Sequence, residues 1–332
     1  ASHSVGRLVD PRYKPPVAEE FNVGYSWAVN TNSVVEVEYT HVLGLHENKT
    51  INIDQRVVGG VDGSGNVILN RPLDAYTGSQ FASVRVEESI NRNRYDGVNF
   101  SYRQRMARHF SLNANYTLAW AYGYDTGGGP NTAFRNYARD GYHPLSPVEW
   151  GPSSNDERHH VTLSGMIDLP HGFQLAPIMQ FGSARPYQLS SSDNPLTPGG
   201  GTATAVIVPK SDPKNYLAYA SDPQGAANCY YLTSNCLISK YDPLRGDPFF
   251  QLDMRLAKNL KLGEKLNVQF IAQAFNLTDR ANYGGNFSGD VSTYDPTAPG
   301  KGAFGHPAGF INPSSTTTPR SLWGEFGVRI SF

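Results

Sequence analysis

Two cysteines lie close together in the chain and could form a covalent cross-link. Cys229 and Cys236 are separated by Tyr-Tyr-Leu-Thr-Ser-Asn, within a stretch that is rich in Asp, Pro and Asn. In an oxidising compartment, a local disulfide is the expected chemistry for such a pair. A zinc site would need further ligands nearby, and none stands out in the sequence. We therefore predict a disulfide between Cys229 and Cys236.

Charged side chains recur on the polar side of several expected strands. Successive side chains of a strand point to opposite faces, so residues two apart share a face. The candidates carry both signs of charge and are Glu36, Glu38, Arg103, Asp168, Asp253, Arg255, Glu325 and Arg329. If the strands enclose a wet lumen, two interpretations stay open. The charges could form an interior ladder of ion pairs, which we favour, or they could line the path of a substrate.

The sequence offers no catalytic, cofactor-binding or metal-binding residues. It contains no Gly-rich phosphate loop, nucleophile elbow or paired-His motif. His159 and His160 are adjacent, so on a strand they point to opposite faces and cannot chelate one metal ion together. Arg245-Gly-Asp247 spells an adhesion tripeptide, but turn chemistry just before a strand explains it better. We expect binding or structural work, and no enzyme.

The elements that position these residues are expected to be amphipathic strands. The clearest run alternates from Phe110 to Trp120, which is about the length of a tilted membrane strand. A second clear strand ends the chain, with one apolar side formed by Leu322, Phe326, Val328, Ile330 and Phe332. A final amphipathic strand that stops on an aromatic residue is typical of a bacterial outer-membrane barrel, where it acts as the assembly signal. An edge strand of a soluble all-β domain is the alternative.

Very short turns alternate with very long loops along the chain. The turns are expected at 106–109, 170–172 and 261–265, and the long loops at about 46–80, 122–156, 190–247 and 280–320. Soluble sandwiches rarely tolerate such loops, whereas outer-membrane barrels have short periplasmic turns and long outer loops. If Phe332 ends in the periplasm, the last three loops lie outside and all three turns lie inside.

This assignment of loops and turns to the two sides of the membrane leaves the arrangement of the N-terminal part of the barrel undecided. Either residues 81–90 do not span the membrane, or a further strand lies between Thr50 and Val58. We expect nine to eleven strands in an antiparallel transmembrane β-barrel, or in the C-terminal half of one. Residues 1–19 are expected to form an extended lead-in segment, and residues 20–332 the barrel region.

Composition agrees with a barrel and excludes other classes. The 332 residues carry a net charge of -1, so no electrostatic footprint for nucleic acid is present. The mean hydropathy is -0.44, and no run of about 20 apolar residues suggests a membrane helix. A barrel strand needs only every second residue to be apolar. Ala1 begins without a positive or apolar leader region, so we expect that a signal peptide is not part of this chain.

Several stretches resemble the Oar-like group of TonB-dependent outer-membrane receptors. They include Asp-Pro-Arg-Tyr-Lys-Pro-Pro at 10–16, Tyr-Asp-Gly-Val-Asn-Phe-Ser-Tyr-Arg-Gln-Arg at 95–105, Asp-Glu-Arg-His-His-Val-Thr-Leu-Ser-Gly at 156–165, and Leu-Asp-Met-Arg-Leu-Ala-Lys-Asn-Leu-Lys-Leu-Gly at 252–263. The resemblance implies a barrel of about 22 strands, an N-terminal plug inside it, and a TonB-contacting box before the plug. The chain has neither plug nor box and about half of the strands, so we expect the C-terminal half of such a barrel.

An open half-sheet would leave unpaired edge groups in the membrane, each costing several kcal/mol. The expected partners are therefore outer-membrane lipid, the barrel-assembly machinery, and either the missing N-terminal half-barrel and plug or a second copy. The TonB system is a partner if a plug is present. Two functions remain open: an outer-membrane transporter or receptor for a bulky solute, and a structural surface protein that self-associates through strand edges. We expect neither cofactor nor nucleic acid.

Overall fold

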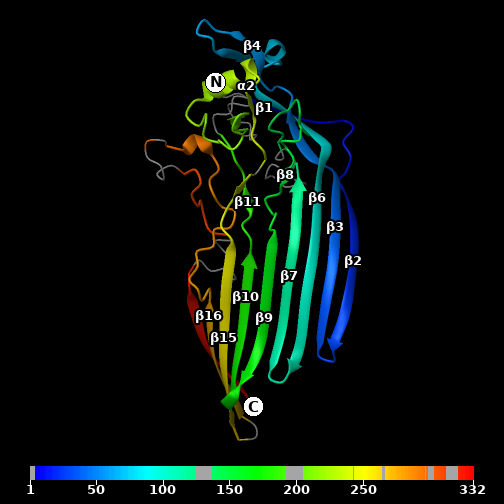
Figure 1. Cartoon of the computed structure of the whole chain (residues 1–332), viewed down its shortest axis with the longest axis vertical. Coiled ribbons are helices and arrows are strands. Elements are labelled where there is room, and N and C mark those ends of the chain that lie inside the picture. The colour runs from blue at the N-terminus through cyan, green and yellow to red at the C-terminus, as the bar shows by residue number, and fades with distance from the viewer. Residues whose placement is uncertain are drawn as a thin grey trace.

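The structure is a computed structural model that describes residues 4–78, 80–124, 137–191, 205–241, 243–263, 266–295, 297, 303–311 and 321–332. Within these residues, nine long strands follow one another across a single antiparallel sheet (Figure 1). They are β2 (Val17–Asn30), β3 (Ser33–Asn52), β6 (Phe81–Ala107), β7 (Phe110–Gly123), β9 (His159–Leu169), β10 (Phe173–Gly182), β15 (Phe249–Leu262), β16 (Leu266–Phe275) and β17 (Trp323–Ser331). The predicted all-β antiparallel class is confirmed, and so is the predicted number of strands.

The sheet has one polar and one apolar face because the register is kept from strand to strand. One row of partners consists of Ser26, Glu36, Ser101, Asn115, Thr162, Gln180 and Gln251. The adjacent row consists of Tyr25, Val37, Phe100, Tyr116, Val161, Phe181 and Phe250. A slip of one residue would exchange the two faces. The polar face and the apolar face are therefore properties of the whole sheet.

The two ends of the sheet differ in the length of their connections. Residues 31–32, 108–109 and the 3-10 turn η1 (Pro170–Gly172) join strands at one end, here called the turn end. Long connections join β3 to β6, β7 to β9, β10 to β15 and β16 to β17 at the opposite loop end (Figure 1). Arg108 and His109 both have positive φ, 49° and 77°, as a tight two-residue hairpin requires. The predicted alternation of short turns and long loops is present.

The structure shows how residues 81–90 are arranged. They belong to β6, which continues past the sheet toward the loop end, and β3 runs beside it as far as Asn52. The expected loop at 46–80 therefore begins later, because residues 46–52 pair with this extension. The expected lead-in segment also contains a strand, β1 (Ser4–Val9), which pairs with β6 in parallel. Weak alternation hid residues 46–52 and 81–90, because nearly all of their side chains are buried or half-buried.

The loop end carries a layer of small elements. The hairpin of β4 (Val57–Val61) and β5 (Val67–Asn70) precedes the short helix α1 (Asp74–Thr77). The later connections contain β8 (Gly151–Pro152), β11 (Pro186–Tyr187), β12 (Ile207–Pro209), α2 (Pro223–Leu232), β13 (Cys236–Ile238), β14 (Leu244–Arg245) and η2 (Val291–Thr293). The side chain of Asp222 caps α2 by accepting from the backbone N–H of Gly225, 2.8 Å away. Most of these elements lie in stretches predicted only as loops.

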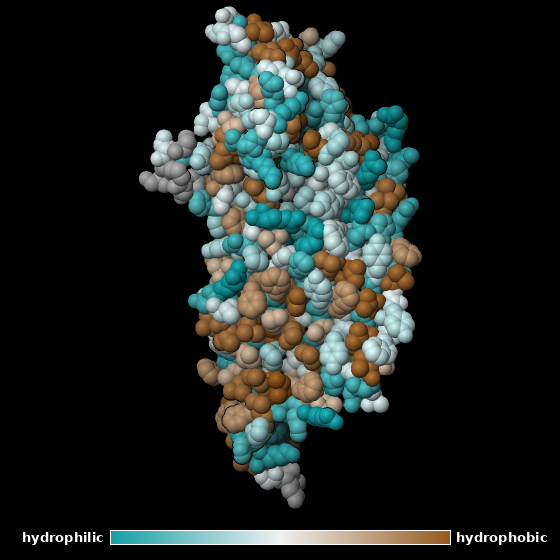
Figure 2. Space-filling view, in the orientation of Figure 1, coloured by the Kyte–Doolittle hydropathy of each residue, from teal (hydrophilic) through white to brown (hydrophobic). Residues whose placement is uncertain are grey.

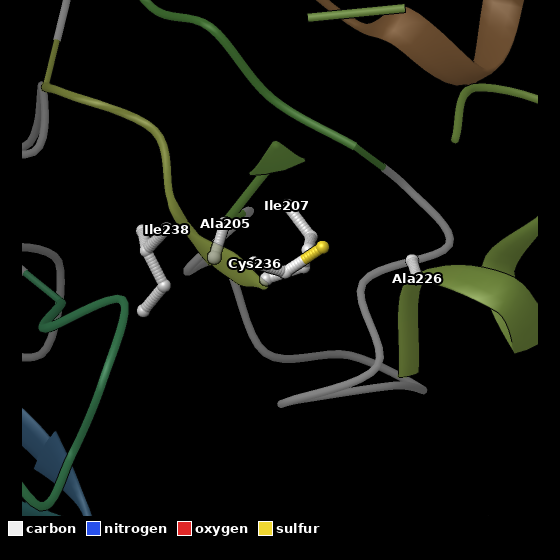
Figure 3. Close-up of a cluster of buried hydrophobic side chains, with 5 residues drawn as sticks. All are labelled: Ala205, Ile207, Ala226, Cys236 and Ile238. Atoms are coloured by element: carbon white, nitrogen blue, oxygen red, sulfur yellow. The ribbon is translucent and has the colours of Figure 1, made fainter. Parts of the chain in front are cut away.

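This layer has its own small apolar core. Ala205, Ile207, Ala226, Cys236 and Ile238 are buried together between β12, β13 and α2 (Figure 3). Helix α2 contacts the β4–β5 hairpin of the same layer, because the side chain of Asn228 accepts from the backbone N–H of Val67 at 2.8 Å. Hydrophobic residues gather over the strands toward the turn end, and hydrophilic residues cover much of the loop end (Figure 2).

The sheet is open at both edges. β2 pairs only with β3, and β17 pairs only with β16, among the strands of the described ranges. Every residue of β2 and β17 is exposed, including the side chains of Tyr25 at 75% and Phe326 at 92%. Two long edges with unpaired backbone groups therefore border the sheet.

Candidate functional site on the polar face and in a loop-end pocket

The polar face is held together by hydrogen bonds between neutral side chains and isolated charges. The carboxylate of Glu36 accepts from the hydroxyls of Ser26 at 3.3 Å and Ser101 at 3.1 Å. In the next strands, the amide of Asn115 donates to the hydroxyl of Thr162 at 3.3 Å. These bonds link consecutive strands along one row. The result is a polar surface that is continuous across the sheet.

The same pattern continues at the C-terminal side of the sheet. Gln273 donates to the carboxylate of Glu325 at 3.4 Å, and Arg255 donates to the amide oxygen of Gln269 at 3.4 Å. Asp253 accepts from the amide of Gln251 at 2.9 Å and 2.8 Å. Charged groups on this side of the polar face are thus paired with side-chain amides.

All eight predicted charges lie on the polar face, as their register positions require. They are Glu36, Glu38, Arg103, Asp168, Asp253, Arg255, Glu325 and Arg329. The favoured ladder of ion pairs is not found in the part of the chain that the structure describes, where none of the ten ion pairs includes any of the eight. The physical reason is register: Glu36 faces two serines, and Arg255 faces Gln273 and Ala176.

A pocket of about 640 Å³ lies at the loop end of the sheet. Its wall includes Arg185, Tyr187, Asn286, Phe287 and Asp290. The rings of Tyr187 and Phe287 are stacked with centroids 5.4 Å apart. Burial raises the pKa of the Tyr187 hydroxyl, so this group stays neutral. Aromatic faces combined with amide, guanidinium and carboxylate groups suit a polar solute with a flat apolar portion.

Two chain segments form the wall of this pocket by close backbone contact. Ser190 donates its N–H to the carbonyl of Gly289 at 2.9 Å, and Val291 donates to the carbonyl of Ser190 at 2.8 Å. A Cβ on Gly289 would lie 1.8 Å from the carbonyl oxygen of Gln188. Glycine is therefore required at 289 for the two segments to approach.

Glu157 connects the pocket to the polar face. Its carboxylate accepts from Arg185, a pocket residue, at 2.8 Å and also contacts Nδ1 of His160. His160 stands on the polar face, where it pairs with Thr117 and Gly182. Burial raises the pKa of Glu157, but the bonds with His160 and Arg185 outweigh this effect and hold the pKa below its ordinary value. A charged, anchored carboxylate thus stands between pocket and polar face.

The other predicted residues also have clear places. Cys229 and Cys236 form the expected disulfide, which joins α2 to β13. His159 stacks on Tyr116 on the apolar face, whereas His160 faces the polar side. Arg245 of the adhesion-like tripeptide pairs with the buried carboxylate of Asp156 at 2.6 Å, which gives it a structural role.

The apolar residues of the last strand lie at one edge of the sheet. Phe326, Val328 and Ile330 face outward with Ala272, Phe270 and Val268 of the neighbouring strand. Leu322 is exposed beside them, and the side chain of Phe332 is fully exposed. The structure therefore places the proposed assembly strand on the apolar face, at the edge that lacks a partner among the described residues.

The described residues contain no group of three or more His, Cys, Asp or Glu that could hold a metal ion. In the same residues, no helix has the length and apolar character that a membrane crossing demands. Sequence reasoning missed Glu157, Arg185, Tyr187, Phe287 and Gly289. These residues lie in loops without periodicity, and the local sequence does not indicate their contacts.

Residues 1–322 match the family model described as outer membrane beta barrel domain. No curated protein matches the chain.

Three solved structures show similarity at low identity. The outer membrane transporter YddB from Escherichia coli is 12% identical, with 83% of this chain and 31% of that chain covered and a TM-score of 0.43. The ferric-catecholate import receptor Fiu from E. coli K12 is 10% identical, with 96% and 28% covered and a TM-score of 0.45. The ferric enterobactin receptor PfeA from Pseudomonas aeruginosa is 9% identical, with 95% and 31% covered and a TM-score of 0.44. The chain spans less than a third of each.

Proposed function

Because the chain belongs to the outer membrane beta barrel domain family, we propose that it is the C-terminal barrel portion of a transporter that takes up a bulky polar solute. The protein is an outer-membrane β-barrel protein of the transporter and receptor type, located in the bacterial outer membrane. One observation carries the proposal further: the continuous polar face leads through Glu157 to the loop-end pocket. The pocket would gather the solute, and the polar face would form one wall of its path.

The chemistry of this function is binding and gating. The stacked rings of Tyr187 and Phe287 would hold a flat part of the solute, and Arg185 and Asn286 would bind its polar groups. Amide and hydroxyl groups along the polar face would replace its water shell during passage. Covalent catalysis has no part in this proposal.

The open sheet needs further strands to close around the path. β2 and β17 both present unpaired edges, and in a membrane each unsatisfied backbone group costs several kcal/mol. We propose that N-terminal strands of the same transporter pair with β2 and β17. A plug within the closed barrel would then receive energy from a TonB system, as the resemblance to Oar-like receptors implies.

Gene deletion tests the proposal in the native organism. A deletion strain would be grown with one nutrient at a time supplied only in a bulky form: a ferric siderophore, cobalamin, an oligosaccharide or a peptide. We expect loss of growth on one of them, restoration by the unaltered gene, and loss again when the proton gradient is dissipated. Growth equal to that of the parent strain on every nutrient would contradict the proposal.

Matched glycine variants connect that result to the pocket. Gly289→Ala places a methyl group 1.8 Å from the Gln188 carbonyl oxygen and should separate the two pocket segments. Gly309 lines the same pocket, but a Cβ at this position would have no atom within 4 Å, so Gly309→Ala is the matched control. We expect Gly309→Ala to restore uptake and Gly289→Ala to reduce it at least tenfold while both variants reach the membrane in equal amounts.

The second candidate function is a surface protein that assembles through its strand edges. The observation in its favour is that β2 and β17 each have one edge without a partner among the described strands. Such edges can pair with each other between copies. Electron microscopy of the native species separates the two functions: a particle of one barrel in detergent supports the transporter, and a polymer supports self-assembly.

A further inference from the structure

A second pocket lies on the apolar face, away from the proposed solute path. It measures about 490 Å³ and is lined by Arg94, Asp96, Trp120, Tyr122, Trp150 and Arg158. Asp96 pairs with Trp120 and Arg94 pairs with Tyr122 across β6 and β7, in line with the apolar pair Phe100 and Tyr116. Four of the six residues thus stand on the outward side of the sheet, at its loop end.

The position of this pocket matches the headgroup level of a membrane. Phe110 begins β7 at the turn end, and Trp120 lies ten residues further along the strand. Ten residues rise about 33 Å, and a tilt of about 40° reduces this to about 25 Å along the membrane normal, which is the height of the apolar band of a barrel. If the turn end lies in the periplasm, Trp120 lies among the headgroups of the outer leaflet.

The pocket has an excess of positive charge. Arg94 pairs with Asp96, but its side chain remains 59% exposed. Arg158 pairs with Asp156 at 3.4 Å, yet the same buried carboxylate binds Arg245 more closely, at 2.6 Å. The Nε of Arg158 is buried and has no hydrogen-bond partner among the residues that the structure describes. One guanidinium of the pocket is therefore incompletely neutralised and has an unused donor.

Aromatic rings complete the pocket. The guanidinium of Arg158 lies over the ring of Trp120, 4.8 Å from its centroid. Trp150 packs edge-on against Tyr124 at 5.0 Å, and the guanidinium of Arg92 lies 5.9 Å from the centroid of that same tyrosine. Arginines held against rings are preorganised for phosphate, and indole rings offer flat faces to a sugar.

We propose that this pocket binds the headgroup of a phosphorylated glycolipid of the outer leaflet. Arg94 and Arg158 would bind the phosphate, and Trp120 and Trp150 would contact the sugar ring. Asp96 already binds Tyr39 and His41 besides Arg94, and its carboxylate can accept from a sugar hydroxyl. The acyl chains would lie below, against Phe100 and Tyr116 on the apolar face.

Lipid titration of the detergent-purified protein tests this assignment. Native mass spectrometry would compare three probes: lipid A with two phosphates, the same lipid A after enzymatic dephosphorylation, and phosphatidylglycerol. We expect lipid A to bind at least tenfold more tightly than either other probe. Equal binding of the dephosphorylated form would show an aromatic belt without a phosphate site, and equal binding of phosphatidylglycerol would exclude recognition of the sugar; either result overturns the proposal.

Variants assign the effect to the two arginines. Arg94→Gln and Arg158→Gln should each weaken lipid A binding about tenfold and leave binding of the dephosphorylated form unchanged. Arg103→Gln is the matched control, because Arg103 lies on the same strand but on the polar face. Unchanged binding by both variants would overturn the proposal. A variant is used only if it shows the heat-dependent gel shift of a folded barrel. If a variant does not, the comparison of the three lipids on the unaltered protein still decides the test.

Discussion

Arg139 and Glu149 form an ion pair that is closed off from solvent. Their Nε and Oε1 atoms are 3.0 Å apart, and the two side chains are 1% and 0% exposed. Arg139 also donates to the carbonyl of Val148 at 2.7 Å and lies over the ring of Tyr241. The pair therefore fastens the connection between β7 and β9 to the segment that leads into β15.

Removal of one partner should open this part of the molecule. Arg139→Ala leaves Glu149 buried without its cation, which typically costs about 3–5 kcal/mol. The Ala138 amide donates to the carbonyl of Thr50, so its hydrogen exchange reports the opening free energy. Arg12→Ala is the control, because Arg12 pairs with Asp10 while 90% exposed, and solvent screens such a surface pair so that its loss should leave stability nearly unchanged. Equal exchange of the Ala138 amide in both variants would refute this role of the pair.

The disulfide should hold α2 against β13. Cys229 and Cys236 enclose a short loop, with a sequence separation of 7. By the chain-entropy relation, such a loop stabilises by about 2.5 kcal/mol. A Cys229→Ser/Cys236→Ala double variant should expose residues 205–241 to protease at least tenfold faster. Reductant should accelerate cleavage of the unaltered protein and have no further effect on the variant; equal cleavage of both proteins under oxidising conditions would argue against the stabilisation.

Adjacent side chains on β9 should differ in their surroundings, with one exposed to water and the next exposed to lipid. Thr162 belongs to the polar row, and Leu163 pairs with Ala114 and Met179 on the apolar face. The two native cysteines are bonded to each other, so an introduced cysteine provides a single thiol. In intact outer membranes, a water-soluble maleimide should label Thr162→Cys and spare Leu163→Cys. A lipid-soluble reagent should show the opposite preference, and the reverse pattern would mean that the faces are exchanged.

The contact between Glu157 and Arg185 should be sensitive to acid. The pKa of Glu157 is lowered in the folded protein, so the contact contributes stability above the unfolded pKa of the carboxyl. That stability is lost as the pH falls through the lower, folded pKa. The Gly246 amide donates to the Arg185 carbonyl. Its protection against hydrogen exchange, measured relative to the intrinsic rate at each pH, should therefore fall below about pH 4.3. Glu157→Gln should remove this pH dependence; its persistence in the variant would assign the effect to another group.

Much of the sheet was predictable because its information is local. The register of β7 and β9 follows from residues two apart that share a face, as in Phe110 to Trp120. The turn at 170–172 follows from Pro170 and Gly172, which favour a tight reversal. By contrast, β6 extends to Phe81 and includes residues 81–90, which the sequence pattern did not identify clearly as a strand. Its outer part lacks alternation because the loop layer and β1 cover it, and only the packed structure reveals that cover.

The candidate site, like the sheet, could be predicted from the sequence only in part. The polar face could be predicted from sequence, since each of its charges alternates with an apolar neighbour. The pocket could not, because Gly289 approaches Gln188, which lies 101 residues earlier in the chain, and Arg185 reaches Glu157 from 28 residues away. The favoured ion-pair ladder is not found among the described residues for a related reason: the sign and position of a charge are visible in the sequence, but the partner across the next strand depends on register.

By itself, the sequence determined the two faces of the sheet, the alternation of short turns with long loops, and the disulfide. Each of these depends on residues within a few positions of one another, where steric and turn preferences act directly. The tertiary structure alone decided which loop segments meet at Glu157, how Arg139 is buried against Glu149, and that β2 and β17 remain open at the edges. Those features depend on contacts between separate elements and loops, which local patterns of polarity do not encode.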